Sequence, residues 1–278
     1  MPGARLDHES RTFTVSQSWL GTFLTCPARA GYELRGEVDS GHTDATLLGS
    51  AWHEYIEDRG RGIPHSTALP KALLMLETTP YQPVKVKTLK TLQDHLHVLV
   101  ASFDEDIYPR LGSDSDSLIE HEFDTQLVDS MDHAEGWDIR LKGTIDRVDS
   151  VHGLIDYKTA GRTGMGSVWE RSGLKFKIQK DAYGYAANEL ELCDPNLFTF
   201  VVATKGATRK PVEWLEAPTG PEDWAWLKHV AKNALECALA GVWAVNHTHH
   251  LCSAKWCDAY ALCRGAVTDS VAVELGSK

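Results

Sequence analysis

The sequence has no long uninterrupted run of apolar residues, and this absence excludes a class of proteins. No window of its 278 residues approaches the roughly 18 consecutive apolar residues that a membrane-spanning helix needs. The first residues also lack the apolar core of a signal peptide; they read MPGARLDHESRTF. We therefore expect a cytoplasmic protein with no membrane partner.

Positive charge and cysteine are both scarce. Lys and Arg number 28 against 39 Asp and Glu, which gives a formal net charge of −11. This balance excludes a uniformly basic coat for nucleic acid, so any such contact needs a local basic track. Six cysteines are too few for a secreted disulfide scaffold, and three of them cluster near the end of the chain. A cluster of reduced thiols suggests a metal site.

The chain also lacks internal repeats, low-complexity runs and long Pro/Gly linkers, so we expect a single interleaved domain over 1–278. Apolar periodicity and turn residues divide it into mixed α/β elements. We predict helices over 16–32, 47–56 and 84–107, strands over 118–128, 137–148 and 153–159, a helix over 177–190, strands over 198–203 and 212–215, and a closing helix over 222–243. Residues 16–110 then form a helical region, 117–220 a core, 221–264 a closing region and 265–278 a tail.

The two predicted strands around Val151 carry the most informative residues. If they form a hairpin that pairs symmetrically about Val151, Asp146 faces Asp156 across the strands. Like charges opposed in a sheet are destabilising, so the pair calls for a cation or a proton between them. The strand period of two puts Lys158 on the same face as Asp156. A solvated hairpin with incidental charges is the alternative.

These strands resemble the PD-(D/E)xK nuclease superfamily, and in particular its branch of RecB-type and CRISPR-associated iron-sulfur exonucleases. The resemblance lies in Gly143-Thr144-Ile145-Asp146 and Leu154-Ile155-Asp156-Tyr157-Lys158-Thr159. It implies a restriction-endonuclease-like core, in which a mixed sheet is flanked by helices. It also implies that a divalent cation is held by Asp146, Asp156 and the carbonyl of Tyr157, with Lys158 beside the attacked phosphate.

Three further features match the order of the resembled family. The segment from Gly49 to His53 lies on an early helix, where the family uses the imidazole as a metal ligand, and such a donor set suits Mn²⁺ as well as Mg²⁺. Gln179 and Tyr183 share a helix face and correspond to a pair that lines the family's substrate cleft. An acidic residue on the first strand of the core is also expected, and the sequence leaves Glu120 and Glu122 as equal candidates.

The late cysteines read CxxxxCxxxxxC, without the paired CxxC knuckles of a zinc ribbon. Together with the early Cys26 they provide four thiolates, enough for a 4Fe-4S cluster. The resembled branch has this split arrangement, although its first gap is commonly shorter. The predicted cluster ligands are Cys26, Cys252, Cys257 and Cys263. A zinc site that uses His249 or His250 is the alternative, and Cys193 and Cys237 are interpreted as buried apolar residues.

The resemblance implies a metal-dependent DNA exonuclease acting on single strands or DNA ends, in recombination and repair, phage DNA processing or CRISPR adaptation. Helicase, recombination or CRISPR adaptation proteins are then possible partners. The alternatives are a catalytically silent DNA-binding scaffold subunit and a zinc-stabilised hydrolase. We expect the basic track to comprise Lys158, Lys175, Lys177, Lys180, Lys205, Arg209 and Lys210.

Overall fold

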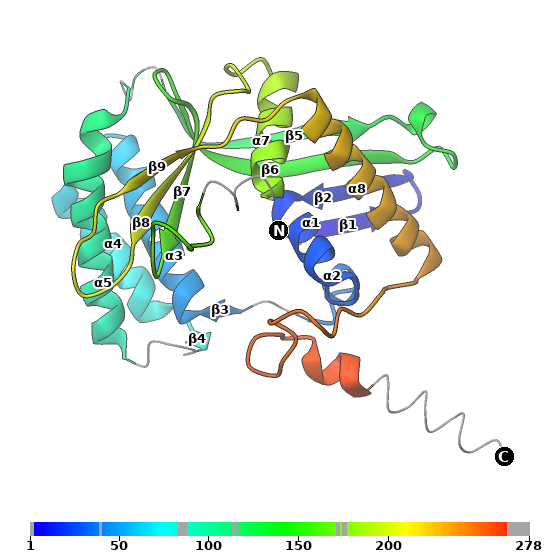
Figure 1. Ribbon diagram of the computed structural model, residues 1–278, viewed down its shortest axis with the longest axis horizontal. Coiled ribbons are helices and arrows are strands. Elements are labelled where there is room, and N and C mark those ends of the chain that lie inside the picture. The colour runs from blue at the N-terminus through cyan, green and yellow to red at the C-terminus, as the bar shows by residue number, and fades with distance from the viewer. Residues whose placement is uncertain are drawn as a thin grey trace. The chain divides into compact units, whose positions relative to one another are not determined.

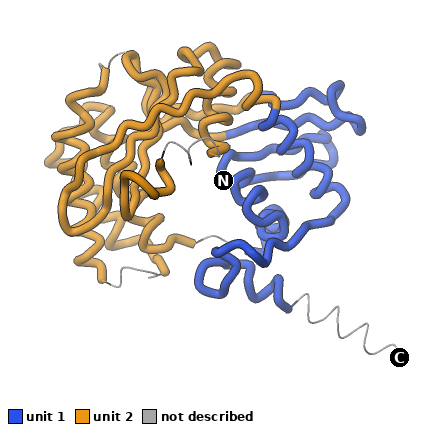
Figure 2. The backbone as a smooth tube through the Cα atoms, viewed as in Figure 1, with its two compact units in different colours: residues 1–40, 126–142, 226–278 blue, residues 41–125, 143–225 orange. Residues whose placement is uncertain are grey.

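The computed structural model describes residues 3–38, 41–82, 88–112, 115, 117–170, 173 and 177–265. Their contacts cluster into two compact units, of which one joins 1–40, 126–142 and 226–278 and the other 41–125 and 143–225 (Figure 2). We call them unit 1 and unit 2. Long strands pass from one unit to the other, so each unit is built from segments distant in the sequence. A single interleaved domain stays a prediction.

Unit 1 contains a small sheet and the two ends of the chain. β1 (Ala4–Asp7) pairs antiparallel with β2 (Thr12–Ser16), which pairs parallel with the first part of β6 (Asp138–Asp149). β1 and β2 were not predicted from the sequence; they are only four and five residues long and contain several polar residues. Two helices follow, α1 (Gln17–Thr25) and α2 (Pro27–Leu34), and the unit also contains most of α8 (Pro221–Ala240) (Figure 1).

The predicted helix over 16–32 is two helices because of Pro27. Proline has no backbone N–H and disfavours helical geometry in the residue before it. Cys26 accordingly has extended geometry, with φ −156° and ψ 99°, and serves as the boundary between α1 and α2. Ser16 caps α1 as expected, because its side chain accepts a hydrogen bond from the backbone N–H of Trp19 at 3.2 Å. Cys26 therefore lies at the junction between α1 and α2.

Unit 2 contains the predicted hairpin in a mixed sheet. The second part of β6 pairs antiparallel with β7 (Gly153–Ala160), β7 pairs parallel with β8 (Phe198–Thr204), and β8 pairs antiparallel with β9 (Glu213–Glu216). β5 (Leu118–Val128) pairs with β6. The structure confirms a mixed α/β fold with a mixed sheet flanked by helices.

Helices lie on both faces of this sheet (Figure 1). On one face, α3 (Asp44–Gly60), α4 (His65–Thr78) and α5 (Leu89–Ser102) form a core with side chains of β7 and β8. On the other face, α7 (Ile178–Glu189) packs Tyr183 against Phe198, with ring centroids 6.2 Å apart. Strand alternation thus sends Ile155 and Tyr157 to the α3 side.

The helical part of unit 2 differs from the prediction in two places. α4 was not predicted from the sequence, and it contains Pro70 within its first turns. The helix predicted over 84–107 is α5 followed by a π-helical turn (Phe103–Ile107), while 84–87 lie outside the described residues. Among the helices that the structure describes, none is long and apolar enough to cross a membrane.

Candidate active site

His53 joins helix α3 to the acidic hairpin. Its Nε2 lies 2.9 Å from the carbonyl oxygen of Tyr157, to which it donates, and its Nδ1 lies 3.6 Å from Oδ2 of Asp146. A histidine of α3 therefore reaches two of the groups that the sequence predicts as metal ligands. Trp52, the residue before it, anchors the helix by donating from its buried indole to the carbonyl of Leu99 at 3.1 Å.

The hairpin has the predicted register, but its ladder ends beside the site. Asp149 pairs with Gly153 and Arg147 with Ile155, as symmetric pairing about Val151 requires. Two residues beyond Ile155, the backbone N–H of Tyr157 instead donates to Oδ2 of Asp146 at 2.8 Å. A side-chain carboxylate thus takes the place of a backbone acceptor, and the N–H and the carbonyl of Tyr157 both bond to predicted site residues.

Close packing against Phe123 explains why the matched motif has a glycine at position 143. A Cβ atom at this position would lie 2.8 Å from Cζ of Phe123, closer than carbon atoms can approach without displacement. The Phe123 ring also contacts Tyr183, with centroids 5.9 Å apart. The missing side chain of Gly143 therefore lets β5 approach the strand that carries Asp146.

Asp156 and Lys158 form a buried ion pair on β7. Nζ of Lys158 lies 2.6 Å from Oδ2 of Asp156, whose side chain is completely buried. Burial raises the pKa of Asp156, and the neighbouring Asp146 raises it further, while Lys158 opposes both effects. Burial works against the Lys158 ammonium, but the two carboxylates nevertheless raise its pKa. Lys158 is thus held as a cation by the acids that it accompanies.

Gln179 and Tyr183 hold the other side of Asp156. Nε2 of Gln179 donates to Oδ1 of Asp156 at 2.6 Å and to the hydroxyl of Tyr183 at 3.1 Å. One turn of α7 separates the two residues, which places both side chains on the face toward β7. The structure therefore brings together His53, Asp146, Asp156, Tyr157, Lys158, Gln179 and Tyr183.

Glu120 joins this group, whereas Glu122 is exposed. The ligand atoms of His53, Glu120 and Asp146 all lie within 4.8 Å of one another. Burial and the nearby Asp146 and Glu57 raise the pKa of Glu120 to about 7. Its φ of +50° interrupts the strand alternation that would have put both glutamates on one face. Such backbone strain carries no signal in the sequence.

This donor set fits a divalent cation. Carboxylates and an imidazole are the ligands that Mn²⁺ and Mg²⁺ accept, and three of them converge here on one position. Burial and neighbouring carboxylates raise the pKa values of Glu120 and Asp156, because the one ammonium of Lys158 leaves part of the negative charge of Glu120, Asp146 and Asp156 without a compensating positive charge. A bound cation would provide that charge.

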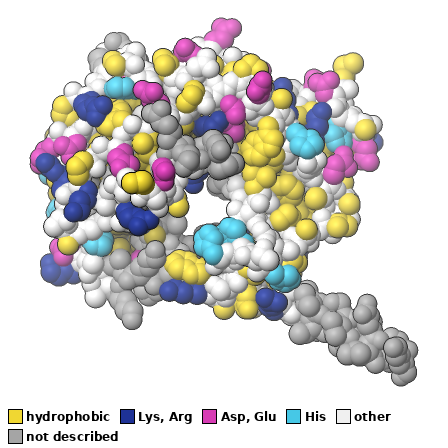
Figure 3. Space-filling view, in the orientation of Figure 1, with side chains coloured by type: hydrophobic (Ala, Val, Ile, Leu, Met, Phe, Trp, Pro, Cys, Tyr) yellow, Lys and Arg dark blue, Asp and Glu magenta, His cyan; other side chains and the backbone are white. Residues whose placement is uncertain are grey.

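Part of the predicted basic track is not available to a ligand. Lys180 is buried, with its Nζ 2.5 Å from Asp181 and 3.3 Å from Asp223, so its prediction as a phosphate contact is wrong. Arg209 pairs with Glu105 and lies 3.7 Å from Asp106. Lys175 lies outside the described residues. On the face seen in Figure 3, Lys and Arg side chains are interspersed with Asp and Glu.

The predicted cluster cysteines meet in unit 1. One small cavity is lined by Cys26, Cys252, Cys257 and Cys263. Burial raises the pKa of Cys263, and the neighbouring Cys26 and Cys252 raise it further. His249 of the zinc alternative also lines the cavity, but its Nδ1 accepts a hydrogen bond from the backbone N–H of Leu251 at 3.2 Å. Cys193 and Cys237 are half-buried and lie outside the cavity lining.

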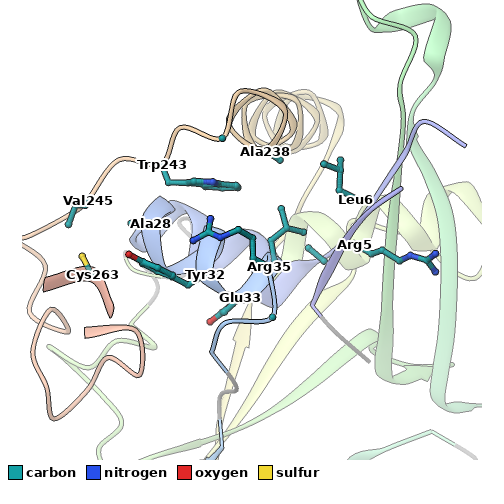
Figure 4. A pocket seen from close by; sticks show the side chains of 14 residues that line it. Arg5, Leu6, Ala28, Tyr32, Glu33, Arg35, Ala238, Trp243, Val245 and Cys263 are labelled. Carbon is teal, nitrogen blue, oxygen red and sulfur yellow. The ribbon is translucent and has the colours of Figure 1, made fainter. Parts of the chain in front are cut away.

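A larger groove of about 870 Å³ shares Cys263 with this cavity (Figure 4). The indole ring of Trp243 lies against α2 there. Gly31 allows this contact because it has no side chain: a Cβ atom at this position would be 2.6 Å from the ring. Nearby, the backbone N–H of Ala28 donates to the carbonyl of Ala244 at 3.0 Å. These contacts hold the segment after α8 against the helix that begins next to Cys26, and so explain how distant cysteines come together.

Known proteins are similar to this chain in sequence pattern and in fold. The sequence pattern of the PD-(D/E)XK nuclease superfamily matches residues 14–264. A crystal structure named "Putative exonuclease", from Eubacterium rectale, is similar with a TM-score of 0.53 and 14% identity, over 85% of this chain and 86% of that one. The structure of SSO0001 gives a TM-score of 0.40 at 14% identity, over 90% and 85% of the two chains. No curated protein matches the sequence. The chain belongs to the PD-(D/E)XK nuclease superfamily.

Proposed function

We propose that the chain is a metal-dependent DNA exonuclease that hydrolyses phosphodiester bonds of single strands or DNA ends. The observation that carries this proposal is the convergence of His53, Glu120 and Asp146, whose ligand atoms lie within 4.8 Å of one another beside the Asp156–Lys158 pair. Mg²⁺ or Mn²⁺ would be held by His53, Asp146, Asp156 and the carbonyl of Tyr157. We add Glu120 to this set because its carboxylate lies within 4.8 Å of the ligand atoms of His53 and Asp146.

Each proposed role follows from a contact. A divalent cation, when bound, lowers the pKa of water and neutralises phosphate charge. Lys158 would stabilise the charge that develops on the attacked phosphate, because its ammonium lies on the same strand face as Asp156. Gln179 and Tyr183 would fix the orientation of Asp156 through the hydrogen bonds described above. His53 would hold Asp146 against the strand end.

A structural 4Fe-4S cluster on the four cysteines is the second part of the proposal. Cys26, Cys252, Cys257 and Cys263 line one cavity, and a cubane cluster takes four thiolates, one on each iron atom. The sequence lacks the paired CxxC knuckles of a zinc ribbon, which favours the cluster over the zinc alternative.

The RecB-type and CRISPR-associated branch is proposed on the same cysteines, since the split between an early Cys26 and three late cysteines is its distinguishing pattern. A role in recombination and repair, phage DNA processing or CRISPR adaptation would then follow, with helicase, recombination or CRISPR adaptation proteins as partners. Copurification of the intact protein with the products of neighbouring genes is the direct test of those partners.

Incubation of the purified protein with DNA labelled at its 5′ or 3′ end, in Mg²⁺ or Mn²⁺, tests the activity. We expect metal-dependent release of short products from one end, abolished by a chelator. Closed circular single strands should resist cleavage. Binding without cleavage under either metal would favour the catalytically silent scaffold subunit, and cleavage of circles would contradict exonuclease action.

A further inference from the structure

Lys177 is a second ammonium group beside the candidate active site. It immediately precedes α7, two residues before Gln179, whose amide bonds to Asp156. Its Nζ lies 4.6 Å from the centroid of the Trp169 ring, a cation–π contact. Both residues lie in unit 2, and neither is a metal-ligand candidate.

Trp169 is tied in turn to the strand that neighbours Asp156. Its ring contacts Phe200, with centroids 5.7 Å apart. Phe200 is the residue of β8 that pairs with Asp156 of β7, and partners in a parallel pair point to the same face of the sheet. The contacts therefore run from Asp156 through Phe200 and Trp169 to the ammonium of Lys177.

The charge of Lys177 is not balanced in the same way as that of Lys158. Lys158 pairs with Asp156 at 2.6 Å, whereas no carboxylate of the described residues forms an ion pair with Lys177. Lys177 is half-buried, and burial together with the nearby Lys158 lowers its pKa more than Asp156 raises it. A half-buried cation is costly unless an opposite charge lies against it, so this position favours an anionic ligand.

We propose that Lys177 binds a backbone phosphate of the DNA strand adjacent to the phosphate under attack, with Trp169 as the residue that positions its ammonium. This inference rests on the proposed nuclease function. Lys177 would thus contribute to holding the strand, whereas Lys158 acts on the reacting phosphate.

The test measures binding of a fluorescent single-stranded oligonucleotide to the full-length protein, with Ca²⁺ in place of Mg²⁺ or Mn²⁺, over a range of salt concentrations. For Lys177→Gln we expect Kd to rise roughly tenfold. The slope of log K against log salt should fall by about 0.7, the value for one phosphate contact on a single strand. Lys177→Arg should retain most of the affinity and the slope.

Lys90→Gln is the matched control, since it removes the same charge from a side chain that is 84% exposed on α5. It should change neither Kd nor the slope. Circular dichroism and the thermal midpoint establish that each variant is folded. An unchanged Kd and slope in folded Lys177→Gln would overturn the inference.

The role of Trp169 is tested by steady-state kinetics. Trp169→Leu should raise KM about as much as Lys177→Gln while leaving kcat within about twofold, and Trp169→Phe should restore most of the KM because it keeps an aromatic face. A fall in kcat with unchanged KM would contradict a positioning role. Failure of the wild type to cleave would contradict the proposed function, while the binding measurement would still decide the role of Lys177. A wild type that binds no DNA would overturn both.

Discussion

Nζ of Lys158 lies 2.6 Å from Oδ2 of Asp156, although the Asp156 side chain is completely buried and a second carboxylate, Asp146, stands nearby. Burial of charge is unfavourable unless a partner compensates it, and two acids with one lysine leave an excess of negative charge. Glu120 increases that excess. The candidate site is therefore least stable when it is empty, and a divalent cation should relieve the repulsion.

The first prediction concerns this repulsion. In wild type, Mn²⁺ should raise the thermal midpoint, because a ligand that binds only the folded state stabilises it by mass action. Asp146→Asn keeps an oxygen that can accept from Tyr157 but removes one charge, so the metal-free variant should be more stable than wild type by about 1 kcal/mol. It should also lose most of the response to Mn²⁺. Equal responses of variant and wild type, measured by calorimetry, would exclude Asp146 as a ligand.

The second prediction separates the two glutamates that the sequence left as equal candidates. Glu120→Gln should weaken Mn²⁺ affinity about 10- to 100-fold, because it removes a carboxylate within 4.8 Å of His53 and Asp146. Glu122→Gln is the control, since Glu122 is exposed. Isothermal titration with Mn²⁺ measures both. Loss of affinity in the control alone would reverse the assignment.

Features that local chemistry determines could be predicted from the sequence. The turn between 149 and 153 sets the hairpin register, so the pairs Asp149–Gly153 and Arg147–Ile155 could be predicted, whereas the predicted pairing of Asp146 with Asp156 lies beyond the end of the ladder. The helix spacing of Gln179 and Tyr183 likewise predicted their shared face. These features depend on residues close together in the chain.

Features that depend on tertiary context could not be predicted. The choice between Glu120 and Glu122 depends on a φ of +50° that interrupts the alternation. Lys180 was expected at the surface, but the fold buries it against Asp181. β2 alternates polar residues with the buried Phe13 and Val15, but it has only five residues, and its pairing with the distant β6 depends on the tertiary fold.

The third prediction concerns pH and the turn of the hairpin. Burial favours the neutral form of Asp149, but bonds from the backbone N–H groups of His152, Val151 and Gly112 and from Arg147 nevertheless lower its pKa. A lowered folded-state pKa stabilises the protein above the unfolded pKa of about 3.9, and this contribution is lost as the pH falls through the folded value.

Asp149→Asn should therefore reduce the free energy of unfolding by about 3 kcal/mol at pH 7, since it leaves the buried Arg147 without its carboxylate. The difference from wild type should shrink as the pH falls below about 4. Urea unfolding of both proteins across this range measures it. A difference that is the same at acidic and neutral pH would contradict the assigned role of the charge.

The fourth prediction concerns the cysteines. Cys26→Ser should lose bound iron and sulfide, the brown colour and the broad absorbance near 400 nm, and the thermal midpoint should fall because α2 is no longer tied to the C-terminal cysteines. Cys237→Ser is the control, because Cys237 is half-buried in the same unit but does not line the cavity. Zinc without iron or sulfide in the anaerobically purified wild type would contradict the cluster.

The most direct test of the account is the single-turnover rate of DNA cleavage in Mn²⁺ by wild type, Lys158→Ala and Asp156→Asn, with folding verified by circular dichroism. Removal of a group that stabilises the reacting phosphate or holds its metal typically costs a hundredfold or more. We predict metal-dependent cleavage by wild type and a loss of at least about a hundredfold in each variant. Cleavage by either folded variant at the wild-type rate would contradict the assignment of this hairpin as the active site.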